Sequence, residues 1–197
     1  MDIKINWAKK ENYGSSRNLN EIKFLVIHYT AVDGDNAISE GNYFAKNVLK
    51  TSAHYFVDSK NVVQSVPDTY VAWHCGGKKL NGAGGSFYGV CKNQNSIGIE
   101  ICDDVKDGVI HPSEKTIDNA VELTKELMKK YNIPAENVIR HFDVTSKQCP
   151  LYFVDDYKWN RDFKSKLTES EYFTGVGFKD GKLYEIDRGK LKNEINV

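Results

Sequence analysis

A polar segment in the last third of the chain carries four side chains that can bind a metal or take part in catalysis. In the sequence VIRHFDVTSKQCPLYF, His141 and Cys149 lie eight residues apart, with Asp143 and Lys147 between them. Zinc binds imidazole nitrogen and thiolate sulphur, and a catalytic zinc takes three protein ligands while a fourth position stays open for water. His28, near the end of an apolar run, could be the third ligand. Spacing alone leaves two alternatives open, a hydrogen-bonded core histidine and a buried cysteine that packs as a small hydrophobe.

The composition limits the class of protein. A chain of 197 residues with 40% hydrophobic residues suffices for one well-cored domain. Because 27 basic residues balance 27 acidic ones, the excess positive charge of a nucleic-acid-binding protein is missing, and we expect no nucleic-acid partner. The sequence also has no apolar signal region and no apolar run of membrane-spanning length. We therefore expect synthesis in the cytoplasm without a signal peptide and no membrane insertion.

Apolar patterning predicts a single α/β domain with a central mixed sheet flanked by helices. The continuous apolar run at residues 22–31 is typical of a strand covered on both faces, and His28 falls near its end. Residues 96–102 form a similar run that contains Glu100. The remaining predicted elements are a hairpin at 53–58 and 61–66, short strands at 70–75 and 137–140, and helices at 37–50, 112–133 and 154–167.

The last thirty residues differ in character from the rest. We predict a domain over residues 1–168 and a C-terminal tail over residues 169–197, in which the sequence VGFKDGKLYEI forms a hairpin that turns on Asp180 and Gly181. The tail is too short to bury a core alone. Two interpretations stay open: a strand pair packed on the main domain, or the start of a linker or wall-binding module.

Five segments, taken together with their order, resemble one enzyme family. FLVIHYTA, SAHYFVD, AWHCG, NSIGIEIC and RHFDVTSKQCP occur in the order and approximate spacing found in the zinc-dependent N-acetylmuramoyl-L-alanine amidases. This family is similar to phage T7 lysozyme and to the peptidoglycan recognition proteins. The resemblance covers roughly residues 20 to 165 and implies a metal in a groove at one face of a mixed sheet.

The resemblance also implies roles for individual residues. The ligands of one Zn²⁺ fall on His28, His141 and Cys149, the same set that metal chemistry suggests. The glutamate of many bacterial and phage members falls on Glu100. Members like T7 lysozyme use a tyrosine and a lysine instead. Lys147 matches that lysine, whereas Ala53 occupies the tyrosine position and Tyr55 is displaced by two residues.

A hydrolytic mechanism follows as a hypothesis. Zinc would activate water, Glu100 would move its proton to the departing amine, and Lys147 would stabilise the oxyanion. The bond cut would join N-acetylmuramic acid to L-alanine of the peptidoglycan stem peptide. We favour the endolysin or autolysin branch, in which the protein lyses the cell wall after release through a phage holin. Alternatives are a cytoplasmic amidase that recycles anhydromuramyl peptides and a peptidoglycan-binding module without activity.

Further residues have open roles. Asp143 could orient a ligand imidazole or cap a turn. His74, in AWHCG, matches a family position beside the groove, where it would contact substrate. Tyr29 and Thr30 follow the first ligand and could line the groove or pack at the strand end.

Three further cysteines surround the glycine-rich segment and the Glu100 strand. A disulfide between Cys75 and Cys91 would pin that segment, and free thiols suit a reducing cytoplasm. A second zinc site that includes Cys102 is the third alternative.

Overall fold

A mixed β-sheet forms the centre of the first of two compact units. The computed structural model describes residues 2–168, 175–180, 182–187 and 190–195, and the chain divides into two compact units, residues 1–167 and 168–197. The first unit contains a six-stranded sheet in the order β1-β5-β4-β7-β3-β8, which confirms the predicted α/β fold. The strands are β1 Ile3–Ile5, β3 Phe24–Tyr29, β4 Tyr55–Val57, β5 Val62–Gln64, β7 Ser96–Ile101 and β8 Val138–Arg140.

The middle of this sheet is parallel. β4, β7, β3 and β8 pair in parallel, so their carboxyl ends meet at one edge, where ligands of open α/β sheets usually bind. β4 and β5 form the predicted antiparallel hairpin, and β1 adds in parallel to β5. A separate antiparallel pair joins β2 (Tyr13–Ser16) to β6 (Tyr70–Ala72).

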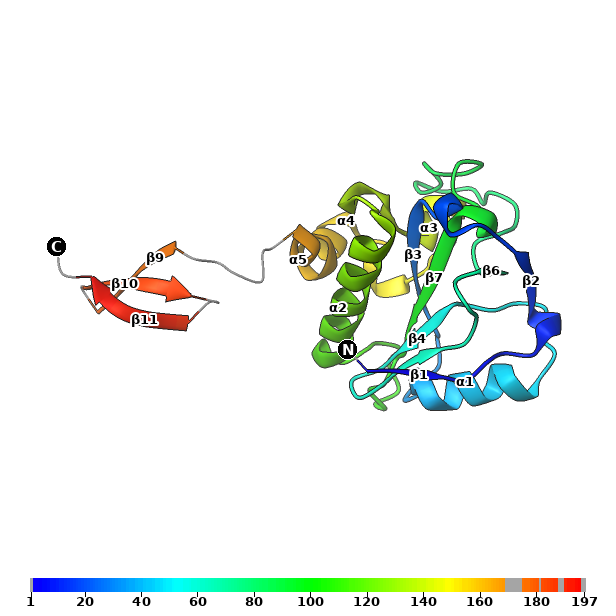
Figure 1. The fold of residues 1–197 in the computed structure, drawn as a ribbon, viewed down its shortest axis with the longest axis horizontal. Coiled ribbons are helices and arrows are strands. Elements are labelled where there is room, and N and C mark those ends of the chain that lie inside the picture. The colour runs from blue at the N-terminus through cyan, green and yellow to red at the C-terminus, as the bar shows by residue number, and fades with distance from the viewer. Residues whose placement is uncertain (1, 169–174, 181, 188–189, 196–197) are drawn as a thin grey trace. The chain divides into compact units, whose positions relative to one another are not determined.

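One face of the sheet packs against the long helix α2 (Glu114–Tyr131), which Figure 1 shows running beside β3 and β7. The helix begins where the Ser113 hydroxyl accepts a hydrogen bond from the backbone amide of Thr116. Alternate residues of the strands and the apolar stripe of the helix form the main core. The core includes Leu25, Ile27, Ile97, Ile99, Ile101, Ala120, Leu123 and Leu127.

The opposite face is covered by shorter elements and carries the polar residues. Helix α1 (Ala37–Lys46) packs on Phe56 and Val63 of the hairpin, and helix α3 (His141–Thr145) follows β8 directly. Because side chains alternate along a strand, His28 of β3 and Glu100 of β7 lie on this second face.

Several elements differ from the sequence-based expectation. α1 ends at Lys46 rather than residue 50, because the backbone of Asn47 is extended. The predicted final helix consists of α4 (Asp156–Trp159), a π-helical turn (Asn160–Lys164) and α5 (Ser165–Thr168). Helix α3 falls in the segment that we expected only to be polar, since five residues are too few to show a helical period.

The second unit is a three-stranded antiparallel sheet in the order β11-β10-β9. Its strands are β9 Gly175–Lys179, β10 Lys182–Asp187 and β11 Lys190–Ile195, the last of which the sequence did not predict. Asp180 of the predicted turn has a positive φ of 51°, and Gly181 lies outside the described residues.

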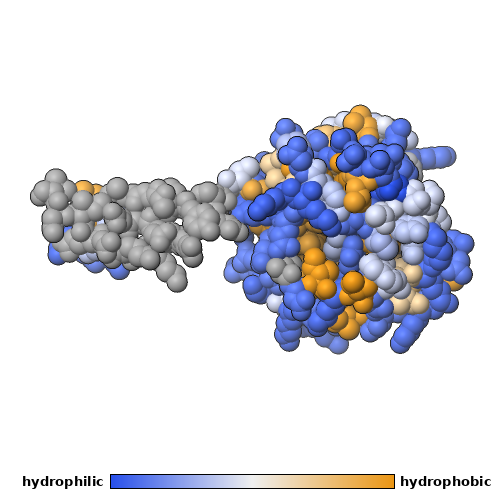
Figure 2. All heavy atoms as spheres, in the orientation of Figure 1, coloured by the Kyte–Doolittle hydropathy of each residue, from blue (hydrophilic) through white to orange (hydrophobic). Residues whose placement is uncertain are grey.

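Hydrophilic side chains dominate the visible face of the first unit, with hydrophobic residues in smaller areas between them (Figure 2). Among the described residues, no helix has both the length and the apolar character needed to cross a bilayer.

Candidate metal centre

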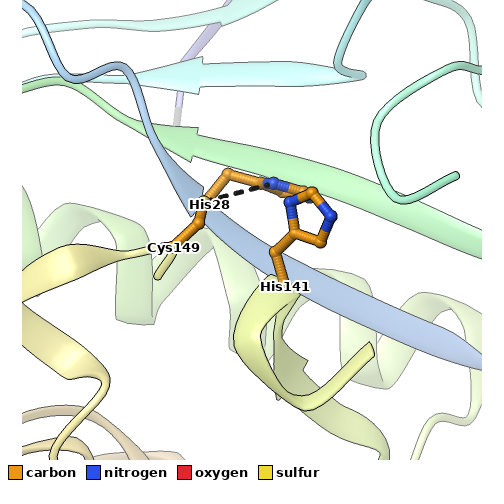
Figure 3. A group of neighbouring side chains, drawn as sticks. All are labelled: His28, His141 and Cys149. Atoms are coloured by element: carbon orange, nitrogen blue, oxygen red, sulfur yellow. Dashed lines mark hydrogen bonds between the residues drawn. The ribbon is translucent and has the colours of Figure 1, made fainter. Parts of the chain in front are cut away.

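Three side chains that are remote in sequence converge at the carboxyl edge of the parallel strands. His28 comes from β3, His141 is the first residue of α3, and Cys149 follows that helix (Figure 3). One nitrogen of each imidazole and the cysteine sulphur all lie within 4.8 Å of one another. The Cys149 sulphur is 3.6 Å from Nδ1 of His28, and all three residues are buried.

The local backbone explains this convergence. β8 runs parallel to β3, so the chain emerges from β8 next to His28 and enters α3 at His141. Ser146 then adopts a positive φ of 63°, which ends the helix and reverses the chain. A hydrogen bond of 2.9 Å from the amide of Phe142 to the carbonyl of Cys149 holds the returning segment beside α3.

The protonation of the group suits a metal ion. Nδ1 of His141 is buried and has no hydrogen-bond partner in the described part of the chain, an arrangement that costs free energy unless another ligand satisfies it. Burial lowers the pKa of His141 to about 4 and that of His28 well below its ordinary value, so both imidazoles are neutral and have a free lone pair. Burial raises the pKa of Cys149 to about 12, and a bound metal would deprotonate it. Two nitrogens and one sulphur fit the donor set of a catalytic zinc.

Glu100 lies beside this group. It pairs with His28 across β3 and β7 and therefore points to the same face of the sheet. Its Oε2 is buried and has no hydrogen-bond partner among the described residues. Burial raises the pKa of Glu100 to about 8, which the positive charge of Lys147 partly opposes. A buried carboxyl group with one oxygen free of hydrogen bonds and a raised pKa is suited to proton transfer.

Lys147 is exposed at the mouth of the site. Its charge lowers the pKa of Glu100, His28 and His141, so its influence reaches the group and its carboxylate neighbour. Lys147 also lines a pocket of about 450 Å³ together with His74 and His141. Two more lysines contribute to the wall of this pocket, Lys50 and Lys78. The pocket therefore favours an anionic ligand.

His74 lines the pocket beside Lys147 and also contacts the first predicted ligand, whereas Asp143 contacts Arg140. His74 is buried and its Nδ1 lies 3.0 Å from Nε2 of His28, so it stands behind the first predicted ligand. Asp143 accepts hydrogen bonds from the backbone and guanidinium of Arg140 at the start of α3. For Asp143 the structure thus favours the capping alternative.

The tyrosines and Thr30 have structural contacts. The Tyr29 ring meets the Tyr152 ring edge-on at 5.7 Å, and the Thr30 hydroxyl lies 3.4 Å from Asp103. Neither residue lines the pocket beside Lys147. The hydroxyl of Tyr55 donates to Asp68 on the opposite face of the sheet, so Tyr55 cannot replace the tyrosine of the T7-like enzymes.

The remaining three cysteines are free thiols in this structure. Cys75 and Cys91 share one buried cluster, and Cys102 belongs to another. Among the described residues, the only group of metal-binding side chains is the one formed by His28, His141 and Cys149, which removes the alternative of a second zinc site there.

Asp103 is an acidic neighbour of Glu100 that the sequence did not single out. Asp103, just beyond the end of β7, accepts a hydrogen bond of 2.8 Å from the amide of Ala31, and its other oxygen is buried with no partner among the residues that the structure describes. Burial and the nearby Asp35 raise the pKa of Asp103 to about 7, although the Ala31 amide opposes the shift. Its position three residues after Glu100, just past the end of the same apolar run, was the sequence feature that could have identified it as a neighbour of the site.

This raised pKa predicts a pH dependence of stability. Between pH 4 and 7, roughly, folded Asp103 holds a proton that the unfolded chain has released, so the free energy of unfolding falls as the pH rises through this window. Asp103→Asn removes that loss and keeps an oxygen for the Ala31 amide. We expect the variant to gain stability relative to the wild type from pH 4.5 to 7.5, measured as urea midpoints. A constant difference across this range would contradict the assignment.

A mixed sheet with parallel central strands, and a buried His–His–Cys group beside the carboxyl group of Glu100, define the chain as a candidate metallohydrolase domain. The comparisons with known proteins specify the class. The N-acetylmuramoyl-L-alanine amidase profile matches residues 18–151, and the chain belongs to this family. The predicted family resemblance is therefore confirmed.

Similarity to individual proteins supports this family membership. The amidase CwlL of Bacillus licheniformis is 38% identical over 151 residues, which cover 74% of this chain and 41% of CwlL. The solved catalytic domain of XlyA is 27% identical with a TM-score of 0.66, covering 85% of this chain and 99% of that domain. A mutant endolysin from Bacillus subtilis is 30% identical with a TM-score of 0.66, covering 85% and 99%. The match spans about two fifths of the length of the first curated relatives.

Proposed function

We propose that the chain is a zinc-dependent N-acetylmuramoyl-L-alanine amidase that hydrolyses the amide between N-acetylmuramic acid and L-alanine of the peptidoglycan stem peptide. The observation that carries the proposal is the buried group of His28, His141 and Cys149 with Glu100 beside it, whose Oε2 has no hydrogen-bond partner among the described residues. Family membership supports the choice of bond, since the relatives carry this activity in their names.

In the proposed site, His28, His141 and Cys149 are the ligands of one Zn²⁺. When bound, Zn²⁺ would supply Lewis-acid activation of water and of the scissile carbonyl. The chain's own contribution to this chemistry is to present two neutral imidazoles and one thiol in a buried cluster. Their convergence is built into the fold, because β3 and β8 are adjacent parallel strands.

Glu100 moves the proton in this proposal. Its carboxylate takes a proton from the attacking water and passes it to the leaving nitrogen of L-alanine, which departs as an amine. The raised pKa of about 8 favours this exchange, because the group both accepts and returns a proton near neutral pH. Lys147 places a positive charge near the carbonyl oxygen, where negative charge develops as water attacks.

The cationic pocket supports a substrate with carboxylate groups, as the stem peptide of peptidoglycan has. Lys50, Lys78 and Lys147 line this pocket beside His141. A binding module without activity would not need Glu100 or a thiol ligand, and both are present. The proposal therefore assigns hydrolysis rather than recognition alone.

The biological role in this proposal is lysis of the bacterial cell wall, as an endolysin or autolysin, with release from the cytoplasm through a phage holin. Similarity to a mutant endolysin from Bacillus subtilis supports this branch. Residues 1–168 would be the catalytic domain. Residues 169–197 would be an extension or the start of a linker or wall-binding module.

Mass spectrometry of digestion products tests the proposal. Purified protein is incubated with intact sacculi and, separately, with a soluble anhydromuramyl peptide. We expect intact sacculi to release peptides that begin with a free L-alanine amine, together with glycan strands whose muramic acid carries a free lactyl carboxylate. New reducing sugar ends or cleaved interpeptide bridges would contradict the amidase assignment. Cleavage of the soluble peptide alone would replace lysis with recycling.

A further inference from the structure

The second nitrogen of His28 has a specific partner. Nδ1 of His28 faces the sulphur of Cys149, and Nε2 on the other side of the ring lies 3.0 Å from Nδ1 of His74. The two rings are nearly perpendicular, at 87°. Beyond His74 the contacts continue: its Nε2 is 3.1 Å from the hydroxyl of Ser96, and that hydroxyl is 2.6 Å from the carbonyl oxygen of Lys92.

The far end of this chain of contacts sets the direction of every hydrogen bond in it. The Lys92 carbonyl can only accept, so the Ser96 hydroxyl donates its single hydrogen to it. The hydroxyl then accepts from Nε2–H of His74, whose Nδ1 keeps a lone pair. That lone pair accepts from Nε2–H of His28. A neutral His28 therefore presents an unprotonated Nδ1 towards Cys149, as a metal ligand requires.

Backbone hydrogen bonds and packing also fix the position of the His74 ring. The amides of His74 and Cys75 donate to the side-chain oxygen of Asn93, at 3.1 and 2.8 Å. The ring packs on Gly98 of β7, where a Cβ atom would lie only 2.6 Å from it. Glycine at this position makes room for the imidazole between the strand and His28. The Cys75 sulphur also lies 3.6 Å from the Ser96 hydroxyl, but the thiol donates to Asn93 at 3.3 Å and the Ser96 hydrogen stays with the closer Lys92 carbonyl.

We propose that His74 is a positioning residue that fixes the tautomer and ring orientation of His28, with Ser96 as the link that sets the direction of the hydrogen bonds. This inference rests on the proposed metal site, since its consequence is tighter zinc binding. Hydrogen-bonded partners of ligating histidines commonly change metal affinity by about 10- to 100-fold. His74 acts through His28 and does not need to contact substrate.

Two substitutions at one position separate positioning from bulk packing. His74→Leu fills much of the same space with an apolar side chain and removes the acceptor for Nε2–H of His28. His74→Asn retains an oxygen near the place of Nδ1 and should preserve that hydrogen bond. His111→Leu is the matched control, because His111 is partly exposed and contacts Asp107 rather than the metal group.

Competition with a chromogenic chelator measures the zinc dissociation constant of each protein. We expect His74→Leu to bind zinc about 10- to 100-fold more weakly than the wild type. His74→Asn and His111→Leu should stay within a few-fold. Equal affinity of His74→Leu and the wild type, or equal weakening in both His74 variants, would overturn the inference.

Nitrogen-15 NMR of the zinc-free proteins tests the tautomer without any metal. The wild type should show His28 protonated at Nε2 and unprotonated at Nδ1, and His74→Leu should lose that preference. A wild-type His28 protonated at Nδ1 would overturn the inference whatever the metal content. If the tautomer is as expected but the wild type binds no zinc, the metal site of the proposed function fails while the role of His74 in fixing the tautomer stands.

Discussion

Replacing Glu100 with glutamine will leave zinc binding intact and lower the turnover of peptidoglycan by about 10²- to 10⁴-fold, the usual contribution of a general acid–base group. Glutamine keeps the shape of the side chain and removes the group that exchanges protons. Because Oε2 of Glu100 has no hydrogen-bond partner among the described residues, the substitution breaks no contact of that atom that would support the fold. Release of soluble muropeptide and zinc content are measured on the same samples.

Glu122→Gln is the control for this substitution. Glu122 is exposed on helix α2, which packs on the opposite face of the sheet from Glu100. We expect the control to keep full activity and zinc. Near wild-type turnover in Glu100→Gln would show that another group moves the proton. Loss of zinc in Glu100→Gln would instead make the glutamate a metal ligand.

Replacing Cys149 with alanine should abolish stoichiometric zinc binding and lower turnover by at least about 10³-fold, because metal activation supplies several kcal/mol of transition-state stabilisation. Cys149 is the sulphur donor of the group, 3.6 Å from Nδ1 of His28. Two neutral imidazoles alone make an incomplete site. Zinc per chain after gel filtration and hydrolysis of sacculi measure the two effects.

The matched control is Cys91→Ala, which also removes one buried thiol but lies outside the group. This variant should keep its zinc. A chelator should lower the melting temperature of the wild type and of Cys91→Ala, because a ligand that binds only the folded state at 100 times its Kd adds about 2.7 kcal/mol of stability. Adding the chelator should leave the melting temperature of Cys149→Ala unchanged. Retention of zinc by Cys149→Ala would exclude the thiol as a ligand.

Much of the fold could be predicted because its elements have long and regular patterns. Eighteen residues of α2 show a clear apolar stripe after a serine cap, and β3 and β7 are continuous apolar runs. Short elements carry no such period. Helix α3 and strand β1 therefore escaped prediction, since tertiary contacts decide the conformation of three to five residues.

The grouping of His28, His141 and Cys149 could be predicted, whereas the contacts behind His28 could not. Histidine and cysteine are distinctive ligands, and five motifs in order placed them in a family. The role that we propose for His74 depends on which side of His28 it approaches, and the packing of its ring on Gly98 reveals that side. One feature of the sequence did indicate that other groups pack on this face of β7. Alternation along the apolar strand puts Ser96, Gly98 and Glu100 on one face, where small and polar residues make room for other groups.

X-ray absorption at the zinc edge tests the central claim most directly, because it counts the atoms around the metal in the wild-type protein. Four-coordinate zinc with one sulphur at about 2.3 Å and three nitrogen or oxygen neighbours at about 2.0–2.1 Å is the predicted result, two of them from histidine and one from solvent. Two or more sulphur neighbours, or a shell filled by protein side chains alone, would contradict a catalytic site built from His28, His141 and Cys149.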